Sequence, residues 1–228
     1  MKKVLICVAH SDDETIGCGG TISYHKSKGH KVFCLSMTDG VGARGDKNNK
    51  AITSRKKSAI RASKILRFKW IEKLCGKFPD NKLDKVSLLD IVKIIEKSKK
   101  MLSPDIIYTH NSSDLNVDHR KVFEAVITAF RPQPKEKWKQ ILSFEVPSAT
   151  DFRNLKKTSN FQPNYFVDIS KHWKKKLQAL KAYKKEMRPT PHSRSLDGIE
   201  TLAKYRGFQS GMKMAEAFEI IKKIRRKS

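Results

Sequence analysis

Three apolar segments of this chain each end directly in a cluster of polar and charged side chains. Residues 3–9 (KVLICVA) run into HSDDE, residues 31–37 (KVFCLSM) run into TDG, and residues 104–110 (PDIIYTH) run into NSSDLNVDH. Continuous apolar runs with β-branched content are typical of strands that are buried on both faces of a sheet. Segments with helical spacing lie between them, so the pattern predicts alternating strands and helices in a mainly parallel sheet.

The remaining segments extend this prediction along the chain. Helices are expected at 15–28, 50–66, 86–102, 116–130, 171–187 and 195–205, strands at 70–75, 140–147 and 165–170, and a last amphipathic stretch at 212–224. We expect an α/β fold, with a Rossmann-like, mainly parallel sheet flanked by helices, as one domain over residues 1–228. Sites in such sheets form outside the carboxyl ends of the strands, which is where the three polar clusters fall.

The chain carries a formal net charge of +26, from 49 Lys and Arg against 23 Asp and Glu. Basic residues are spread along most of the sequence, without zinc-finger spacing, an RNP-type aromatic strand or a basic zipper. Three interpretations stay open: a solvated surface with a lysine bias, attraction of an anionic small substrate or membrane surface, and nucleic-acid binding.

Cysteine usage and hydropathy bear on the compartment. The four cysteines are widely spaced, with no CxxC pair, and this spacing favours buried free thiols in a reducing compartment. No stretch approaches the roughly 18 apolar residues needed to span a bilayer. The apolar run after Lys2 and Lys3 is shorter than the about 7–15 residues of a secretory signal. We therefore expect a cytoplasmic protein without a transmembrane segment.

The polar clusters contain the residue types of a metal site. Zinc favours His nitrogen and Asp oxygen, and catalytic zinc sites combine three protein ligands with a water. His10 and Asp13 follow the first strand and His119 begins a helix after another strand, so all three are expected at one sheet edge. A cation there resolves the crowding of Asp12 and Asp13, because one carboxylate binds it while the other accepts a proton from water. The simpler alternative is a helix N-terminus with favourable acids and a structural His119.

The segment AHSDDE, residues 9–14, resembles the AHPDDE motif of the PIG-L/LmbE family of zinc-dependent N-deacetylases. The resemblance continues over nearly the whole chain, at TDG (38–40), FPDNKLD (78–84), DLNVDHR (114–120), PSATDF (147–152), PNYFVDIS (163–170), LAKYRG (202–207) and MAEAFEI (214–220). It implies an LmbE-like fold and hydrolysis of an N-acetylated amino-sugar conjugate to acetate and a free amine. A GlcNAc-type glycoside, or a lipid- or nucleotide-linked sugar, is the implied substrate.

Motif positions carry over the family's roles residue by residue. His10, Asp13 and His119 would bind Zn²⁺, with another divalent metal as the alternative, and Asp12 would be the general base. Many family members have a second histidine where this chain has Asn116. Asparagine is no general acid at neutral pH, although its amide can donate to an oxyanion. Asp118 would normally orient that histidine, so its role here is open.

Candidates for the remaining roles lie elsewhere in the chain. His192, in the RPTPHS loop, is the hypothetical substitute proton donor, against the alternative of a surface histidine. His110, at the end of the 104–110 strand, is a second candidate donor or substrate contact. Arg55 matches a family arginine near the sugar site and Arg194 adjoins His192, so either can bind a substrate phosphate or hydroxyl.

Two other classes of function compete with the deacetylase. Gly17, Gly19 and Gly20 after the first strand, and Asp39 after the second, superficially match a nucleotide-binding Rossmann domain. The acidic first turn opposes pyrophosphate binding. The other alternative is a polyanion-binding protein without hydrolase activity. The expected partner is a small amino-sugar conjugate that can be anionic, with no dedicated nucleic-acid module, and a homo-oligomer is left open.

Overall fold

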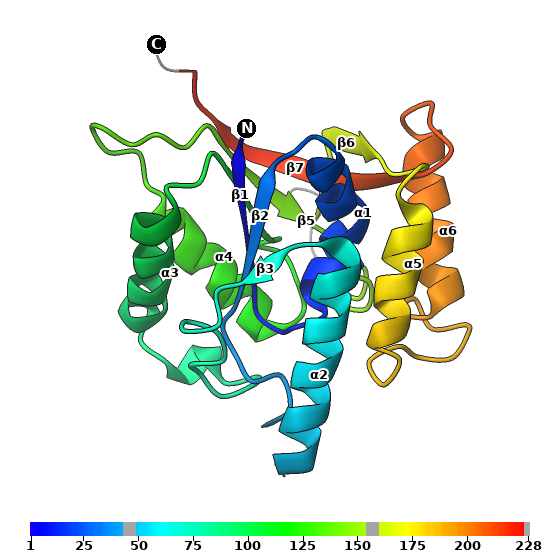
Figure 1. Cartoon of the computed structure of the whole chain (residues 1–228), viewed down its shortest axis with the longest axis horizontal. Helices are drawn as coiled ribbons and strands as arrows, with labels where there is room; N and C mark the ends of the chain where they lie inside the picture. The colour runs from blue at the N-terminus through cyan, green and yellow to red at the C-terminus, as the bar shows by residue number, and fades with distance from the viewer. Residues whose placement is uncertain (43–48, 154–159, 226–228) are drawn as a thin grey trace.

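A mostly parallel sheet forms the centre of the molecule. The computed structural model describes residues 1–42, 49–153 and 160–225, and within them the sheet has seven strands in the order β3-β2-β1-β4-β5-β7-β6 (Figure 1). β2-β1-β4-β5 and the β2–β3 pair are parallel, whereas β7 runs antiparallel to β5 and β6. The predicted α/β fold with a mainly parallel sheet is confirmed. The strands are β1 (Lys3–Val8), β2 (Lys31–Ser36), β3 (Lys69–Trp70), β4 (Ile106–His110), β5 (Gln140–Phe144), β6 (Tyr165–Asp168) and β7 (Ala215–Lys223).

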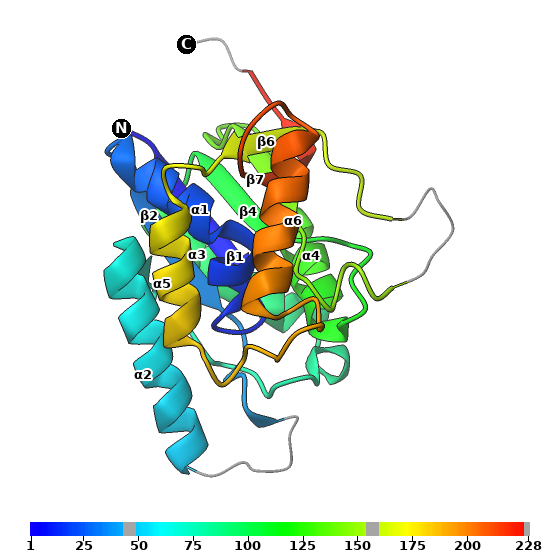
Figure 2. The ribbon, with the colours of Figure 1, turned by 90° about the vertical axis from the view of Figure 1, so that its right-hand side faces the viewer.

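Helices cover both faces of the sheet. Because successive side chains of a strand point to opposite faces, Ile6 and Val8 pack into one core while Leu5 and Cys7 pack into the other. Helices α3 and α4 cover the face of Leu5, and α1, α2, α5 and α6 cover the face of Ile6 (Figures 1 and 2). The helices are α1 (Asp13–Ser27), α2 (Asn49–Leu66), α3 (Leu88–Leu102), α4 (Val117–Ala129), α5 (Trp173–Ala182) and α6 (Leu196–Phe208), with a short 3₁₀ helix η2 (Leu83–Lys85).

The glycines of α1 let this helix lie against the sheet. A Cβ built on Gly17 would lie 2.3 Å from a ring carbon of Phe144, and one on Gly20 would lie 2.5 Å from Ile169 Cγ2. The glycines therefore serve close packing, at some cost in helix propensity.

Three local predictions differ from the structure. The strand expected at 70–75 pairs with β2 at Lys69 and Trp70 and ends once the Ile71 N–H has bonded the Cys34 carbonyl, because the N–H groups of Leu74 and Cys75 bond back to the Ile71 carbonyl in a turn. The stretch at 212–224 is strand β7, and the helix expected at 171–187 ends at Ala182. The prediction of free thiols is confirmed, with three cysteines buried and Cys75 half-buried. No helix in the described ranges is both long and apolar enough to cross a membrane.

The topology brings the polar clusters together. β1 pairs in parallel with β2 on one side and with β4 on the other, so the carboxyl ends of all three strands lie at one edge of the sheet. The residues that follow these strands, 9–13, 37–40 and 111–119, therefore meet there.

Candidate metal centre

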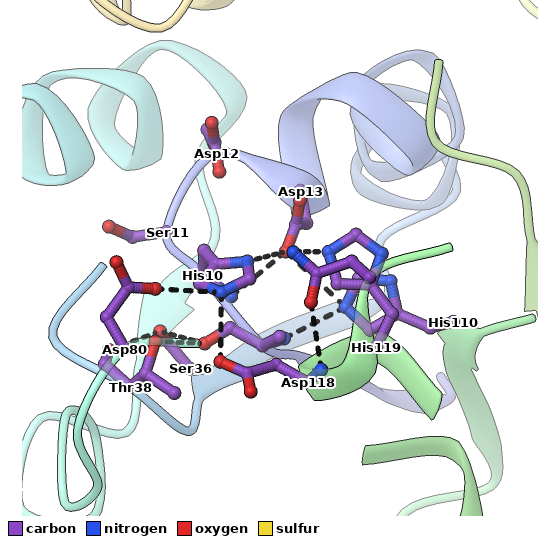
Figure 3. A network of polar contacts seen from close by, with 12 residues as sticks. His10, Ser11, Asp12, Asp13, Ser36, Thr38, Asp80, His110, Asp118 and His119 are labelled. Carbon is purple, nitrogen blue, oxygen red and sulfur yellow. Dashed lines mark hydrogen bonds and ion pairs between the residues drawn. The ribbon is translucent and has the colours of Figure 1, made fainter. Parts of the chain in front are cut away.

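His10, Asp13 and His119 converge at this edge of the sheet (Figure 3). Asp13 Oδ2 lies 3.2 Å from His10 Nδ1 and 3.4 Å from His119 Nε2. One ligand atom from each of the three residues lies within 4.8 Å of the other two. The buried Asp13 Oδ1 has no hydrogen-bond partner among the described residues. Two imidazoles and a carboxylate with a free oxygen are a donor set that suits zinc.

A carboxylate holds the far nitrogen of each of these two imidazoles. His10 Nε2 lies 3.0 Å from Asp80 Oδ1 and 3.2 Å from Asp118 Oδ2, and His119 Nδ1 lies 2.8 Å from Asp114 Oδ2. Such carboxylate partners are usual for metal-binding histidines, because they fix the ring orientation and raise its basicity. They leave His10 Nδ1 and His119 Nε2 facing Asp13.

The buried carboxylates of the cluster favour protonated imidazoles. Burial by itself lowers the pKa of His10, but hydrogen bonds to Asp118, Asp13 and Asp80 raise it well above its usual value. Burial also opposes protonation of His119, and the charge of Asp13 with the Asp114 hydrogen bond raises its pKa. Burial raises the pKa of Asp13, but the charges of His119 and His110 bring it well below its usual value. Protons on the imidazoles thus offset the carboxylate charge, and a divalent cation would have to displace them, because metal ligands must be deprotonated.

Asp12 faces a different set of partners. Its Oδ1 lies 2.8 Å from Arg55 Nη2 and its Oδ2 lies 3.9 Å from Arg194 Nη1. Figure 3 draws no contact between Asp12 and the three candidate ligands. Burial raises the pKa of Asp12, while the charge of Arg55 opposes this shift. Arg55 is only 7% exposed, because its guanidinium also contacts Glu186 at 2.5 Å and Ser11 Oγ at 3.2 Å. It is therefore placed to hold Asp12 and presents little surface to a substrate.

A cavity of about 510 Å³ collects the other predicted residues. Asn116, His192 and Arg194 all line it, together with the exposed side chains of Arg188 and Phe152. Arg194 also contacts Asp12, the residue before Asp13, so it links the cavity to the segment that carries two candidate ligands. His192 Nδ1 accepts a hydrogen bond from the Arg194 backbone N–H at 3.0 Å. In the neutral ring the proton is therefore on Nε2.

Asn116 and Asp118 also form hydrogen bonds with backbone groups that hold the local structure. Asn116 is the N-cap of α4, where its Oδ1 accepts the Asp118 N–H at 2.8 Å. The Asp118 carboxylate accepts the N–H groups of Asn81 (2.7 Å) and Leu83 (2.9 Å) and contacts His10. Asp118 thus orients a candidate ligand and fixes the loop that carries Asp80.

His110 lies behind the metal centre and is not among the residues that line the cavity. It is fully buried and stacks on His119 with the ring centroids 3.8 Å apart. Its Nε2 accepts the Ala9 N–H at 2.9 Å. Burial and the neighbouring His119 lower its pKa to about 4. A neutral, enclosed ring of this kind supports His119 and does not reach a substrate in the cavity.

Comparison with known proteins identifies the family. Residues 5–130 match the PIG-L family, described as GlcNAc-PI de-N-acetylase. This chain belongs to the PIG-L family. It is 28% identical over 189 residues to the uncharacterized deacetylase YaiS of Escherichia coli, which covers 80% of this chain and 91% of YaiS. It is also 28% identical over 232 residues to the diacetylchitobiose deacetylase of Thermococcus kodakarensis, covering 97% of this chain and 84% of the relative.

Solved structures show the same fold as this PIG-L member. The N,N'-diacetylchitobiose deacetylase from Pyrococcus horikoshii superposes with a TM-score of 0.74 at 22% identity, covering 96% of this chain and 84% of that one. The zinc-inhibited form of teicoplanin deacetylase Orf2 gives a TM-score of 0.76 at 14% identity, covering 95% and 96%. The predicted resemblance and LmbE-like fold are thereby confirmed, and family membership supports the predicted amide hydrolase activity.

Two residues of the candidate site were not predicted from the sequence. Asp80 and Asp114 hold His10 and His119, and both lie in segments, FPDNKLD and DLNVDHR, that resembled the family. Their signal was positional: each is an acid in a loop at the carboxyl edge of the sheet. No spacing within the sequence connects Asp80 to His10.

Proposed function

We propose that this chain is a zinc-dependent N-deacetylase that hydrolyses the acetamide of an N-acetylated amino-sugar conjugate. The observation that carries the proposal is the buried cluster of His10, Asp13 and His119, with carboxylates on the far ring nitrogens. The relatives named as diacetylchitobiose deacetylases support an amino sugar as the substrate. Arg188 and Arg194 in the cavity support a conjugate with an anionic group, such as a lipid- or nucleotide-linked sugar.

His10, Asp13 and His119 would hold the metal. Zinc, when bound there, supplies Lewis-acid polarisation of the acetamide carbonyl and a water of lowered pKa. Asp12 accepts a proton from the attacking water, whose oxygen adds to the carbonyl carbon. Arg55 and Arg194 keep the Asp12 carboxylate ionised and oriented, since both guanidinium groups contact it.

Departure of the amine needs a proton donor. When the C–N bond breaks, the nitrogen takes a proton from His192, and acetate leaves separately. Only the imidazolium form of His192 can give this proton, so Nδ1 must release the Arg194 N–H as the ring takes up a proton from solvent, and Nε2 then carries the transferable proton. The Asn116 carbonyl oxygen is used by the α4 cap, and its NH₂ group is left to donate to the developing oxyanion. His192 and Asn116 thus share the work that a second motif histidine does in other family members.

Acetate release from a panel of N-acetyl sugar conjugates, with and without a chelator, tests the reaction. We expect release from at least one conjugate and its loss on chelation. Metal analysis should find zinc in the purified wild-type chain and little in His119→Ala. Release that survives complete removal of metal would refute the metal-dependent mechanism. Release from no member of the panel, with salt-dependent binding of polyanions, would favour a binding protein without hydrolase activity.

The role of His192 has its own test. His192→Gln is expected to keep its zinc and lower kcat by about 100-fold or more, because general acid catalysis contributes on that order. His172→Gln is the matched control, since His172 bonds Ser23 on the helix face and does not line the cavity. Near-normal turnover of zinc-loaded His192→Gln would exclude His192 as the donor.

A further inference from the structure

Two basic segments without acids fall on one pair of helices, α2 and α5. Between residues 49 and 69, and again between residues 169 and 185, the sequence contains no Asp or Glu. Exposed cations cover α2 with its following turn, and α5 with its flanking turns. They are Lys50, Lys56, Lys57, Arg61, Lys64, Arg67 and Lys69 from the first segment, and Lys171, Lys174, Lys175, Lys181, Lys184 and Lys185 from the second. We call these residues the α2–α5 basic face.

None of these cations has a carboxylate within 4.0 Å among the residues that the structure describes. Helices α3, α4 and α6 differ, because each carries acids that form ion pairs with some of its cations. Lys93 lies 3.8 Å from Asp90 on α3, and Lys121 lies 2.8 Å from Glu124 on α4. A cation on α6, Lys204, lies 2.6 Å from Glu200. The charge of the α2–α5 basic face is therefore uncompensated, whereas α3, α4 and α6 each carry acids that pair with part of their cations.

The two basic helices form one continuous surface. Figure 2 shows α2 and α5 side by side, and Arg55 of α2 reaches Glu186, just beyond α5, to join them. Arg188, two residues after Glu186, is exposed and lines the candidate catalytic cavity. Ile60, which is 48% exposed, lies on α2 next to Arg61.

We propose that the α2–α5 basic face docks on a membrane surface that contains anionic lipids, with the cavity mouth next to that surface. Lysine is a mobile point charge that suits a diffuse layer of headgroups, and each lysine near such a surface strengthens binding about fivefold. Single-stranded nucleic acid is usually bound in a groove with aromatic platforms. α2 contains no aromatic residue, and the Trp173 ring of α5 is half-buried in the core. The face therefore fits a lipid surface better than a nucleic acid.

Cosedimentation with phosphatidylcholine vesicles, with and without phosphatidylglycerol, tests this docking. We expect binding only to the vesicles with phosphatidylglycerol, weakened by added salt because the charges are exposed. A variant with four substitutions that neutralise lysines of the face should bind these vesicles at least about 100-fold more weakly than the wild type. That variant changes Lys57, Lys64, Lys174 and Lys181 to Gln.

A matched variant removes the same charge from other surfaces of the chain. It changes Lys93, Lys97, Lys100 and Lys139 to Gln, all exposed, and should bind within about threefold of wild type. Equal thermal midpoints of both variants and the wild type would establish that they are folded.

Three outcomes would overturn the proposal. They are equal loss of binding in both variants, no preference for phosphatidylglycerol, and tighter binding of a single-stranded RNA than of the vesicles at the same salt. His119→Ala should still dock normally, so the docking is tested separately from deacetylase activity.

Discussion

His25, near the end of α1, is expected to make the fold sensitive to acid. The His25 side chain is only 5% exposed. Its Nε2 lies 3.0 Å from the Tyr108 hydroxyl, and its Nδ1 lies 2.9 Å from His30 Nδ1. Burial first, and then the positive charges of His30 and Lys2, lower the pKa of His25 from 6.5 to about 3. The folded protein therefore holds this ring in its neutral form at any pH near neutrality.

The sign and size of the effect follow from proton binding. Between pH 6.5 and 3 the unfolded chain binds a proton at this position and the folded chain does not, so stability falls as the pH falls through this window. At pH 5, about 1.5 units below the unfolded value, the loss is about 2 kcal/mol, since each unit corresponds to about 1.4 kcal/mol. Because pH 5 lies well above the folded pKa, this magnitude hardly depends on its value.

Urea unfolding of the wild type and His25→Gln at pH 7.5 and pH 5 measures the effect. We expect the free energy of unfolding of the wild type to fall by about 2 kcal/mol more than that of the variant. His172→Gln is the control, because His172 is only half-buried and should change the pH dependence less. The same pH dependence in the wild type and His25→Gln would refute the reasoning.

Three further outcomes are expected. Gly20→Ala should lower the free energy of unfolding by about 1–3 kcal/mol in urea titrations, because its Cβ would overlap Ile169. Gly19→Ala should cost less, because the nearest atom to its Cβ, Lys176 Cγ, would lie 3.0 Å away instead of 2.5 Å. Asn116→Ala should lower the free energy of unfolding by about 1 kcal/mol in the same assay, through loss of the α4 cap. Asn116→Asp should retain most of the stability, because aspartate is also a good N-cap. Asp13→Asn should reduce the zinc content of the purified chain below that of the wild type, as measured by atomic emission.

The sheet was predictable because its signals are local to each element. Apolar runs such as 3–9 and 104–110 identified strands that are buried on both faces, and their spacing required crossover helices. The prediction failed at 70–75, where the apolar content is similar but the chain turns after Trp70 and its amide groups bond back within four residues. Apolar content alone does not decide between a strand and a turn that is packed against the core.

The candidate ligands were predictable for a related reason. His10 and Asp13 are adjacent to a strand end, and His119 opens a helix beyond another, so topology alone brings them to one edge. Asp80 reaches His10 from a loop whose course depends on the Asp118 carboxylate and its two backbone contacts. Such a contact depends on tertiary structure, and no periodicity in the sequence encodes it.

The basic face also depends on tertiary structure and could not be predicted from the sequence. The acid-free segments at 49–69 and 169–185 were visible in the sequence, yet they are far apart in it and each resembles the solvated face of one helix. Packing of α2 against α5 places both segments on one surface. Salt screens exposed charges within about 8–10 Å, so their electrostatic potentials add only because the two helices are neighbours. Strand order decides which helices become neighbours. The same count of lysines would produce no continuous basic face if an acid-bearing helix such as α6 lay between them.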